Sequence, residues 1–85
     1  MKKITRMKHY LRKMYGIETL RVELPTEEAD GAIYVSNAVH IQVPTYGGSF
    51  NVVQQINETT FKFFPDRHYW PELVTDIRTA LRGAA

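Results

Sequence analysis

The middle of the chain, from residue 17 to residue 64, contains short segments in which apolar and polar residues alternate, and none with helical periodicity. Strands without helices between them favour antiparallel pairing, because parallel pairing needs a crossover of a dozen or more residues. The alternation is plainest at Leu20, Val22 and Leu24, which share one face of a strand that Pro25 ends. This part of the chain therefore predicts an antiparallel meander.

Further strands are predicted within residues 32–36, 38–44, 49–56 and 59–64. Turn-forming residues join the segments in two pairs, 32–36 with 38–44 and 49–56 with 59–64. Val52 and Val53 break the strict alternation, which predicts a bulge or a strand that is buried on both faces. In the last strand, we expect Phe61 and Phe63 to point one way and Lys62 to point the other.

A helix is predicted at each end of the chain. Residues 2–15 repeat apolar side chains at spacings of three and four, and Gly16 is placed to cap the helix; the stripe is Ile4, Met7, Leu11 and Met14. The second helix begins at Pro71, and its stripe is Leu73, Val74, Ile77, Ala80 and Leu81. Each helix has one apolar face, so we expect both helices on one face of the sheet.

The predicted fold class is therefore α+β: an N-terminal helix, a four- to five-stranded antiparallel meander and a C-terminal helix. A chain of 85 residues is expected to form a single domain, residues 1–85. The sheet face away from the helices is expected to be open to water and to carry Arg21, Glu23, His40, Gln42 and Lys62.

Composition excludes several classes of protein. The chain has no cysteine, which excludes a disulfide framework, a zinc ribbon and thiol catalysis. The spacing of the three histidines predicts no metal site, and no motif predicts a cofactor. The N-terminus shows no apolar run that would mark a signal peptide, so we expect a soluble cytoplasmic protein, of a kind common in bacteria and phages.

The charge distribution is the strongest indication of function. The net charge is only +2, yet no acidic residue precedes Glu18. The remainder of the chain, from residue 14 on, holds five basic and nine acidic residues. The first helix holds six of the eleven Lys and Arg residues: Lys2, Lys3, Arg6, Lys8, Arg12 and Lys13. Such a helix is either a solvated surface or a surface that contacts phosphates.

The leading hypothesis is a non-enzymatic binding module that contacts nucleic acid or a ribonucleoprotein through these six basic residues. Tyr10, Tyr15 and His9 lie among the cations, where bases could stack on them. Secondary contacts are predicted at Arg21, His40, Gln42, Tyr46, Lys62 and Arg67. Attachment to a membrane is not expected, because the apolar stripe of the helix is needed for the core.

The alternative hypothesis is a protein-interaction module, either a homodimer or a small inhibitor or adaptor of a larger assembly. A sheet edge, the loop around Tyr46 or the corner at Trp70 would then contact the partner. The basic helix could also contact an acidic partner surface, so the sequence leaves both hypotheses open.

The chain carries no catalytic motif. Gly47 and Gly48 lead from one predicted strand into another, which predicts a hairpin bend rather than a phosphate-binding loop at a helix N-terminus. Neither Ser36 nor Ser49 lies in a nucleophile elbow. The aromatic residues of the segment 65–70 are expected to fill the corner between the sheet and the second helix. No family signature is found, and we expect no enzymatic activity.

Overall fold

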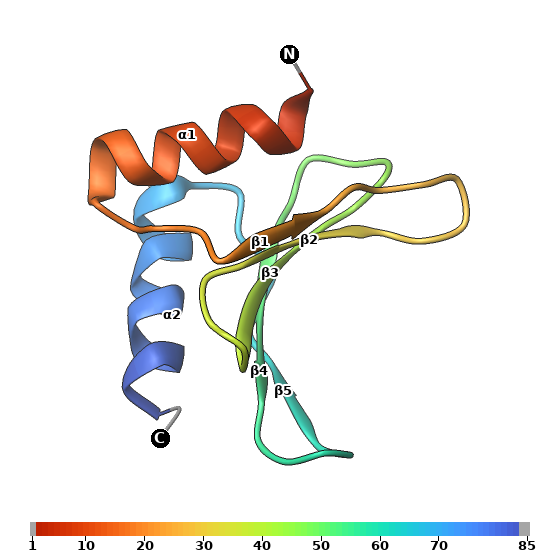
Figure 1. Ribbon diagram of the computed structural model, residues 1–85. Coiled ribbons are helices and arrows are strands. Elements are labelled where there is room, and N and C mark those ends of the chain that lie inside the picture. The colour runs from red at the N-terminus through yellow and green to blue at the C-terminus, as the bar shows by residue number, and fades with distance from the viewer. Residues whose placement is uncertain (1, 84–85) are drawn as a thin grey trace.

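The structure is a computed structural model that describes residues 2–83, and it confirms the predicted α+β fold (Figure 1). A five-stranded antiparallel sheet has its strands in chain order, so every strand pairs with its neighbours in sequence. The elements are α1 (Lys3–Tyr15), β1 (Arg21–Glu23), β2 (Gly31–Tyr34), β3 (Val39–Val43), β4 (Asn51–Gln55), β5 (Phe61–Phe63) and α2 (Trp70–Gly83). Neither helix is long and apolar enough to cross a membrane.

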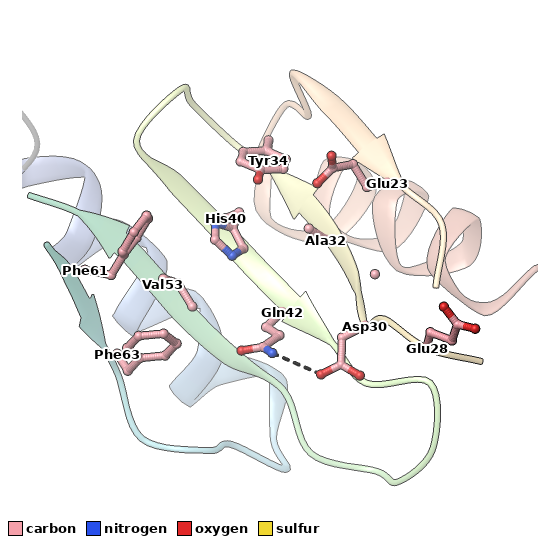
Figure 2. A pocket seen from close by; sticks show the side chains of 11 residues that line it. Glu23, Glu28, Asp30, Ala32, Tyr34, His40, Gln42, Val53, Phe61 and Phe63 are labelled. Atoms are coloured by element: carbon pink, nitrogen blue, oxygen red, sulfur yellow. Dashed lines mark hydrogen bonds between the residues drawn. The ribbon is translucent and has the colours of Figure 1, made fainter. Parts of the chain in front are cut away.

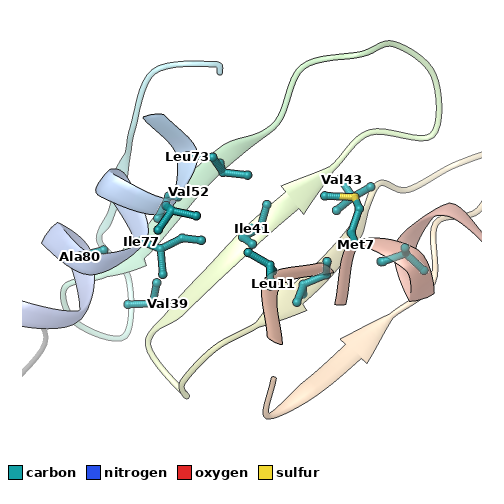
Figure 3. Packing of buried hydrophobic residues seen from close by; sticks show 12 residues of the cluster. Met7, Leu11, Val39, Ile41, Val43, Val52, Leu73, Ile77 and Ala80 are labelled. Atoms are coloured by element: carbon teal, nitrogen blue, oxygen red, sulfur yellow. The ribbon is translucent and has the colours of Figure 1, made fainter. Parts of the chain in front are cut away.

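Both helices pack on one face of the sheet, as predicted (Figures 1 and 3). The core lies between them and the inner face of the central strands. From the helices it takes Ile4, Met7 and Leu11 of α1 and Leu73, Val74, Ile77 and Ala80 of α2. From the sheet it takes Ile33, Val39, Ile41, Val43 and Val52. At about 25 cal/mol per Å² of buried apolar surface, this cluster is the main source of stability.

Four residues of the predicted apolar stripes lie outside the core: Met14, Leu20, Leu24 and Leu81, of which Leu81 is 37% exposed. The side chain of Met14 is 56% exposed, because Tyr15 and Ile17 pack against the core where α1 ends. Leu20 and Leu24 are also largely exposed, because β1 is an edge strand and is only three residues long. Of Leu20, Val22 and Leu24, which were predicted to share one face, only Val22 packs against the core.

The orientation of β5 corrects the prediction for Lys62. Phe63 pairs with Val53, which pairs with His40 of the sheet face away from the helices. Lys62 pairs with Gln54, which pairs with the core residue Val39. Phe61 and Phe63 therefore lie on the sheet face opposite the helices, which we call the open face. The Lys62 ammonium lies on the helix side, 4.9 Å from the ring centroid of Phe64.

The turn between β4 and β5 sets this register. The amide of Ile56 donates to the carbonyl of Thr60 at 2.8 Å, and the side-chain oxygen of Asn57 accepts hydrogen bonds from the amides of Thr59 and Thr60. Because neighbouring side chains alternate in a strand, a register fixed at the turn decides the face of every residue of β5. The half-buried Phe64 then takes the position against the core.

The structure also settles two predictions for the hairpin β3–β4. The pairing is continuous from Val39–Gln54 to Gln42–Asn51, and both Val52 and Val53 are buried. Of the two alternatives, β4 is thus the strand buried on both faces. Gly47 and Gly48 lie in the hairpin loop between β3 and β4, as predicted, and Gly47 has a φ of 105°, which favours glycine.

Candidate nucleic-acid interface

The burial of Ile4, Met7 and Leu11 determines which side of α1 faces water. Residues three and four apart lie on the same side of a helix, so all the remaining positions of α1 point sideways or outward. The positively charged residues and one histidine on those positions are all exposed or partly exposed: Lys2, Lys3, Arg6, Lys8, His9, Arg12 and Lys13. All six basic residues predicted to contact phosphates are therefore on the surface.

Two of the six make contacts within the protein. The Lys3 ammonium donates to the carbonyl oxygen of Gly47 at 3.3 Å and lies 4.9 Å from the ring centroid of Phe50. Lys3 thus holds the β3–β4 loop against the start of α1. The Arg12 Nε lies 3.5 Å from a carboxylate oxygen of Glu18, in an exposed ion pair. Such exposed pairs contribute little, about 0–1 kcal/mol.

The other four basic residues, three in α1 and one at its N-cap, have no acidic partner within residues 2–83. They are Lys2, Arg6, Lys8 and Lys13, and the ion pairs of the described chain involve only Arg12 and Arg67. Because α1 contains no acidic residue, its like charges repel one another. The outward side of α1 is therefore a region of uncompensated positive charge.

A hollow of about 200 Å³ lies beside the C-terminal half of α1. It is lined by Lys8, His9, Arg12, Glu18 and Thr19. The Thr19 hydroxyl is buried and has no hydrogen-bond partner among residues 2–83. A hydroxyl and two cations are groups that bind phosphate oxygens, although the Glu18 carboxylate opposes an anion here. Thr19 is not predictable as part of this hollow from the sequence, because nothing in its neighbourhood shows that the chain folds back beside α1.

The aromatic residues of α1 pack against one another and against Trp70, although Tyr10 remains 38% exposed. The Tyr10 ring centroid lies 4.7 Å from that of Trp70 and 6.1 Å from that of Tyr15. These rings connect α1 to the start of α2, and Trp70 packs against the core, as expected for the corner between sheet and helix. Stacking of bases on Tyr10 would compete with this packing.

The predicted secondary contacts are scattered over the molecule. Arg21, His40 and Gln42 lie on the open face, away from α1. Tyr46 is 77% exposed on the β3–β4 loop. Lys62 lies on the helix side of β5, and the guanidinium of Arg67 bonds to Asp76 and Glu72. The structure thus brings none of these residues together with the cations of α1 into one surface, except that Lys3 contacts the loop of Tyr46.

The open face has a hollow of its own, of about 490 Å³ (Figure 2). Phe61 and Phe63 lie at one side of it, and the carboxylates of Glu23, Glu28 and Asp30 lie at the other. The Asp30 carboxylate accepts a hydrogen bond of 3.0 Å from the amide group of Gln42. Three carboxylates repel a phosphate backbone, so the open face does not extend the basic surface of α1.

His40 lies at the centre of this hollow (Figure 2). Its ring centroid is 4.8 Å from that of Tyr34. Burial lowers the pKa of His40 below its usual value of 6.5; the charge of Glu23 raises that pKa and the charge of Arg21 lowers it. His40 is therefore mostly neutral at pH 7.

Within residues 2–83, no three His, Asp or Glu side chains are close enough together to hold a metal ion. Comparison with protein-family models, with curated proteins and with solved structures finds no match. The candidate function therefore depends on the surface chemistry of this chain alone.

Proposed function

We propose that the protein is a non-enzymatic module that binds the phosphate backbone of nucleic acid through α1. The observation that carries this proposal is the outward side of α1, where four cations have no acidic partner in the described chain. A lysine or arginine that serves only solubility does not require that neighbouring acidic residues be absent. A helix free of acids has its clearest use in contact with an anion.

Binding would draw its free energy from the release of counterions. Each phosphate that a lysine or arginine neutralises releases condensed cations from the nucleic acid. Binding also relieves the repulsion among the cations of α1. These contacts fix position on the backbone and carry no sequence information, so we expect binding of many sequences with similar affinity.

The packing of Tyr10 against Trp70 supports our expectation that this surface prefers duplex nucleic acid. Single strands gain affinity when bases stack on exposed aromatic rings. The 13-residue helix instead offers about 20 Å of positive charge along its axis. We therefore expect duplexes to bind at least as tightly as single strands.

The test is fluorescence anisotropy of labelled duplex and single-stranded oligonucleotides at several salt concentrations. The variant Arg6→Gln, Lys8→Gln, Lys13→Gln removes three charges that have no acidic partner in the described chain. Lys3 is left unchanged, because its ammonium holds the β3–β4 loop. A control, Lys62→Gln, Arg82→Gln, removes two exposed charges outside α1. Arg78 is left unchanged, because its guanidinium donates to the carbonyl oxygen of Tyr15 at the end of α1.

We expect the α1 variant to bind more weakly. Its salt dependence should be smaller by about 0.9 in log–log slope for each duplex phosphate that the variant no longer neutralises. The control variant should retain most of the affinity. Equally weakened binding in the two variants would mean that only net charge matters. Absence of binding by the unchanged protein at low salt would refute the proposal.

The open face supports a second candidate function, a protein-interaction module. Phe61 and Phe63 are 46% and 65% exposed, and the carboxylates of Glu23, Glu28 and Asp30 line the same hollow. This arrangement suits a peptide segment with an apolar side chain beside a lysine or arginine.

A synthetic peptide that carries phenylalanine next to arginine tests this function. We expect it to shift the NMR resonances of Phe61, Phe63 and His40 in the unchanged protein. In the variant Phe61→Ser, Phe63→Ser the shift of His40 should disappear, whereas the α1 variant should keep the shifts of all three residues. Shifts on α1 alone, or none, would exclude the open face as a peptide site.

A further inference from the structure

The edge strand β1 has a chemically symmetric sequence. Around Val22 the order is Leu20, Arg21, Val22, Glu23, Leu24, so that apolar residues flank a positive and a negative charge. β1 pairs with β2 on one side, and its other side pairs with no strand of the described chain (Figure 1). Leu20 and Leu24 are 56% and 48% exposed, and the alternation of the strand places both on the same face as Val22.

Antiparallel pairing of two copies of β1 about Val22 would satisfy both charges. In this register, Arg21 lies directly opposite Glu23 of the partner subunit, and the two-fold axis repeats the pair. Directly opposed residues point to the same face, so both charge pairs would lie on the open face. In the single chain, the Arg21 guanidinium rests on the Tyr34 ring, with Cζ 3.9 Å from the ring centroid.

The same register would cover the two exposed leucines. Leu20 would lie opposite Leu24 of the partner subunit, and Val22 would lie opposite its own copy, all on the helix side of the joined sheet. Leu20 and Leu24, which the fold of one chain leaves in water, would then pack against apolar side chains.

The opposite edge of the sheet lacks this symmetry. Lys62 is the central residue of β5, so self-pairing about it would place two ammonium groups opposite one another. A lysine on an edge strand is a common means of preventing such pairing. The two edges therefore differ: the charge of Lys62 disfavours pairing of β5 with a second copy, whereas the charges of β1 favour such pairing.

We infer that β1 is a self-complementary edge at which a second copy of this chain binds, and that two five-stranded sheets join there into one. The two α1 helices then lie on the same side of the joined sheet, because opposed residues keep their faces. This inference does not depend on nucleic-acid binding. The contact is short, so the dimer is expected to be weak and its population to depend on protein concentration.

Charge exchange at positions 21 and 23 tests the inference. Glu23→Arg places arginines opposite arginines, and Arg21→Glu places glutamates opposite glutamates. Measured by analytical ultracentrifugation over a range of concentrations, each variant alone should dimerise at least about tenfold more weakly than the unchanged protein.

Two rescues make the test specific. The double variant Arg21→Glu, Glu23→Arg exchanges the charges and should recover dimerisation. An equimolar mixture of the two single variants should form a heterodimer, because every like-charge pair becomes an opposite pair. A Lys62→Glu variant serves as the control at the other edge and should leave the dimer unchanged, and circular dichroism confirms that each variant is folded.

Three results would overturn the inference. One is a protein that stays monomeric at millimolar concentration. Another is a dimer that is insensitive to both single charge reversals. The third is two single variants that do not associate when mixed although each is folded. None of these results bears on oligonucleotide binding, so failure here and failure of the proposed function are distinguishable.

Discussion

The guanidinium of Arg67 binds the carboxylate of Asp76 with two hydrogen bonds, of 2.7 Å from Nε and 3.2 Å from Nη2. Asp76 is only 6% exposed on α2. The backbone of Arg67 is itself paired with Phe50, by hydrogen bonds of 2.7 Å and 2.9 Å. Arg67 therefore joins α2 to the sheet, and its hydrogen bond with Asp76 raises the pKa of the guanidinium further above its usual value.

Removal of Arg67 should destabilise the fold, because it leaves the Asp76 carboxylate buried without its cation. We expect Arg67→Met to lower the urea midpoint clearly. The double variant Arg67→Met, Asp76→Leu should recover much of that stability, since it leaves no buried charge. Urea unfolding followed by circular dichroism measures both. Equal destabilisation in the single and double variants would mean that packing, not charge, is what Arg67 contributes.

Stability should fall as the pH is lowered below about 6.5. The pKa of His40 is lower in the folded protein than in the unfolded chain, so around and below pH 6.5 His40 binds more protons in the unfolded chain than in the folded one. The stabilisation is complete above 6.5 and declines as the pH falls toward the folded pKa. We expect His40→Gln to reduce this slope between pH 7.5 and 5.5.

The matched control for His40 is His9→Gln, on the exposed side of α1. This variant retains His40 and should retain the part of the pH dependence that His40 causes. Urea midpoints at four pH values are sufficient for the comparison. If the slope of His40→Gln equals that of the unchanged protein, the burial of His40 does not control acid sensitivity.

Leu11 and Met14 give a matched pair of truncations on one helix. Leu11 is fully buried in the core, whereas Met14 is 56% exposed. Leu11→Ala should destabilise the protein by about 2–5 kcal/mol, because it removes buried apolar surface and leaves a cavity. Met14→Ala should change the unfolding free energy by less than about 0.5 kcal/mol. A large effect of Met14→Ala would indicate that this side chain is covered in solution.

Substitution of Gly16 and Gly48 by alanine distinguishes the effect of backbone conformation from the effect of steric space. A Cβ at either position would meet nothing within 4 Å, but Gly16 has a φ of 67° as the cap of α1. Gly16→Ala should therefore cost about 1–2 kcal/mol. Gly48 lacks a positive φ, so Gly48→Ala should leave stability unchanged or raise it slightly, by about 0.4–1 kcal/mol. Thermal unfolding of the two variants makes the comparison.

Local patterns were sufficient to predict the fold class, because the apolar stripe of each helix and the alternation in each strand depend only on residues close in sequence. They failed where a turn determines the outcome. Phe61 and Phe63 look like core residues, yet the Asn57 turn sets a register that turns both to the open face. The helix side is occupied instead by Lys62, whose ammonium lies near the Phe64 ring, and by Phe64, which packs against the core.

The candidate interface was predictable to a similar extent. Charge counting along residues 2–15 identified the basic helix, because all the residues concerned lie on one element. It could not show that Lys3 holds the β3–β4 loop, that Arg67 is bound to Asp76, or that Thr19 lies beside α1. Each of these facts depends on how separate segments of the chain come together in space.

The order of strands in the sheet has a consequence for how the chain folds. Each strand pairs with the next one along the chain, so every pairing closes a short loop and costs little chain entropy. The two helices, by contrast, share a core although they lie at opposite ends of the sequence. We therefore expect hairpin formation to be fast, and the docking of α1 and α2 on the same face to be the step that limits the folding rate.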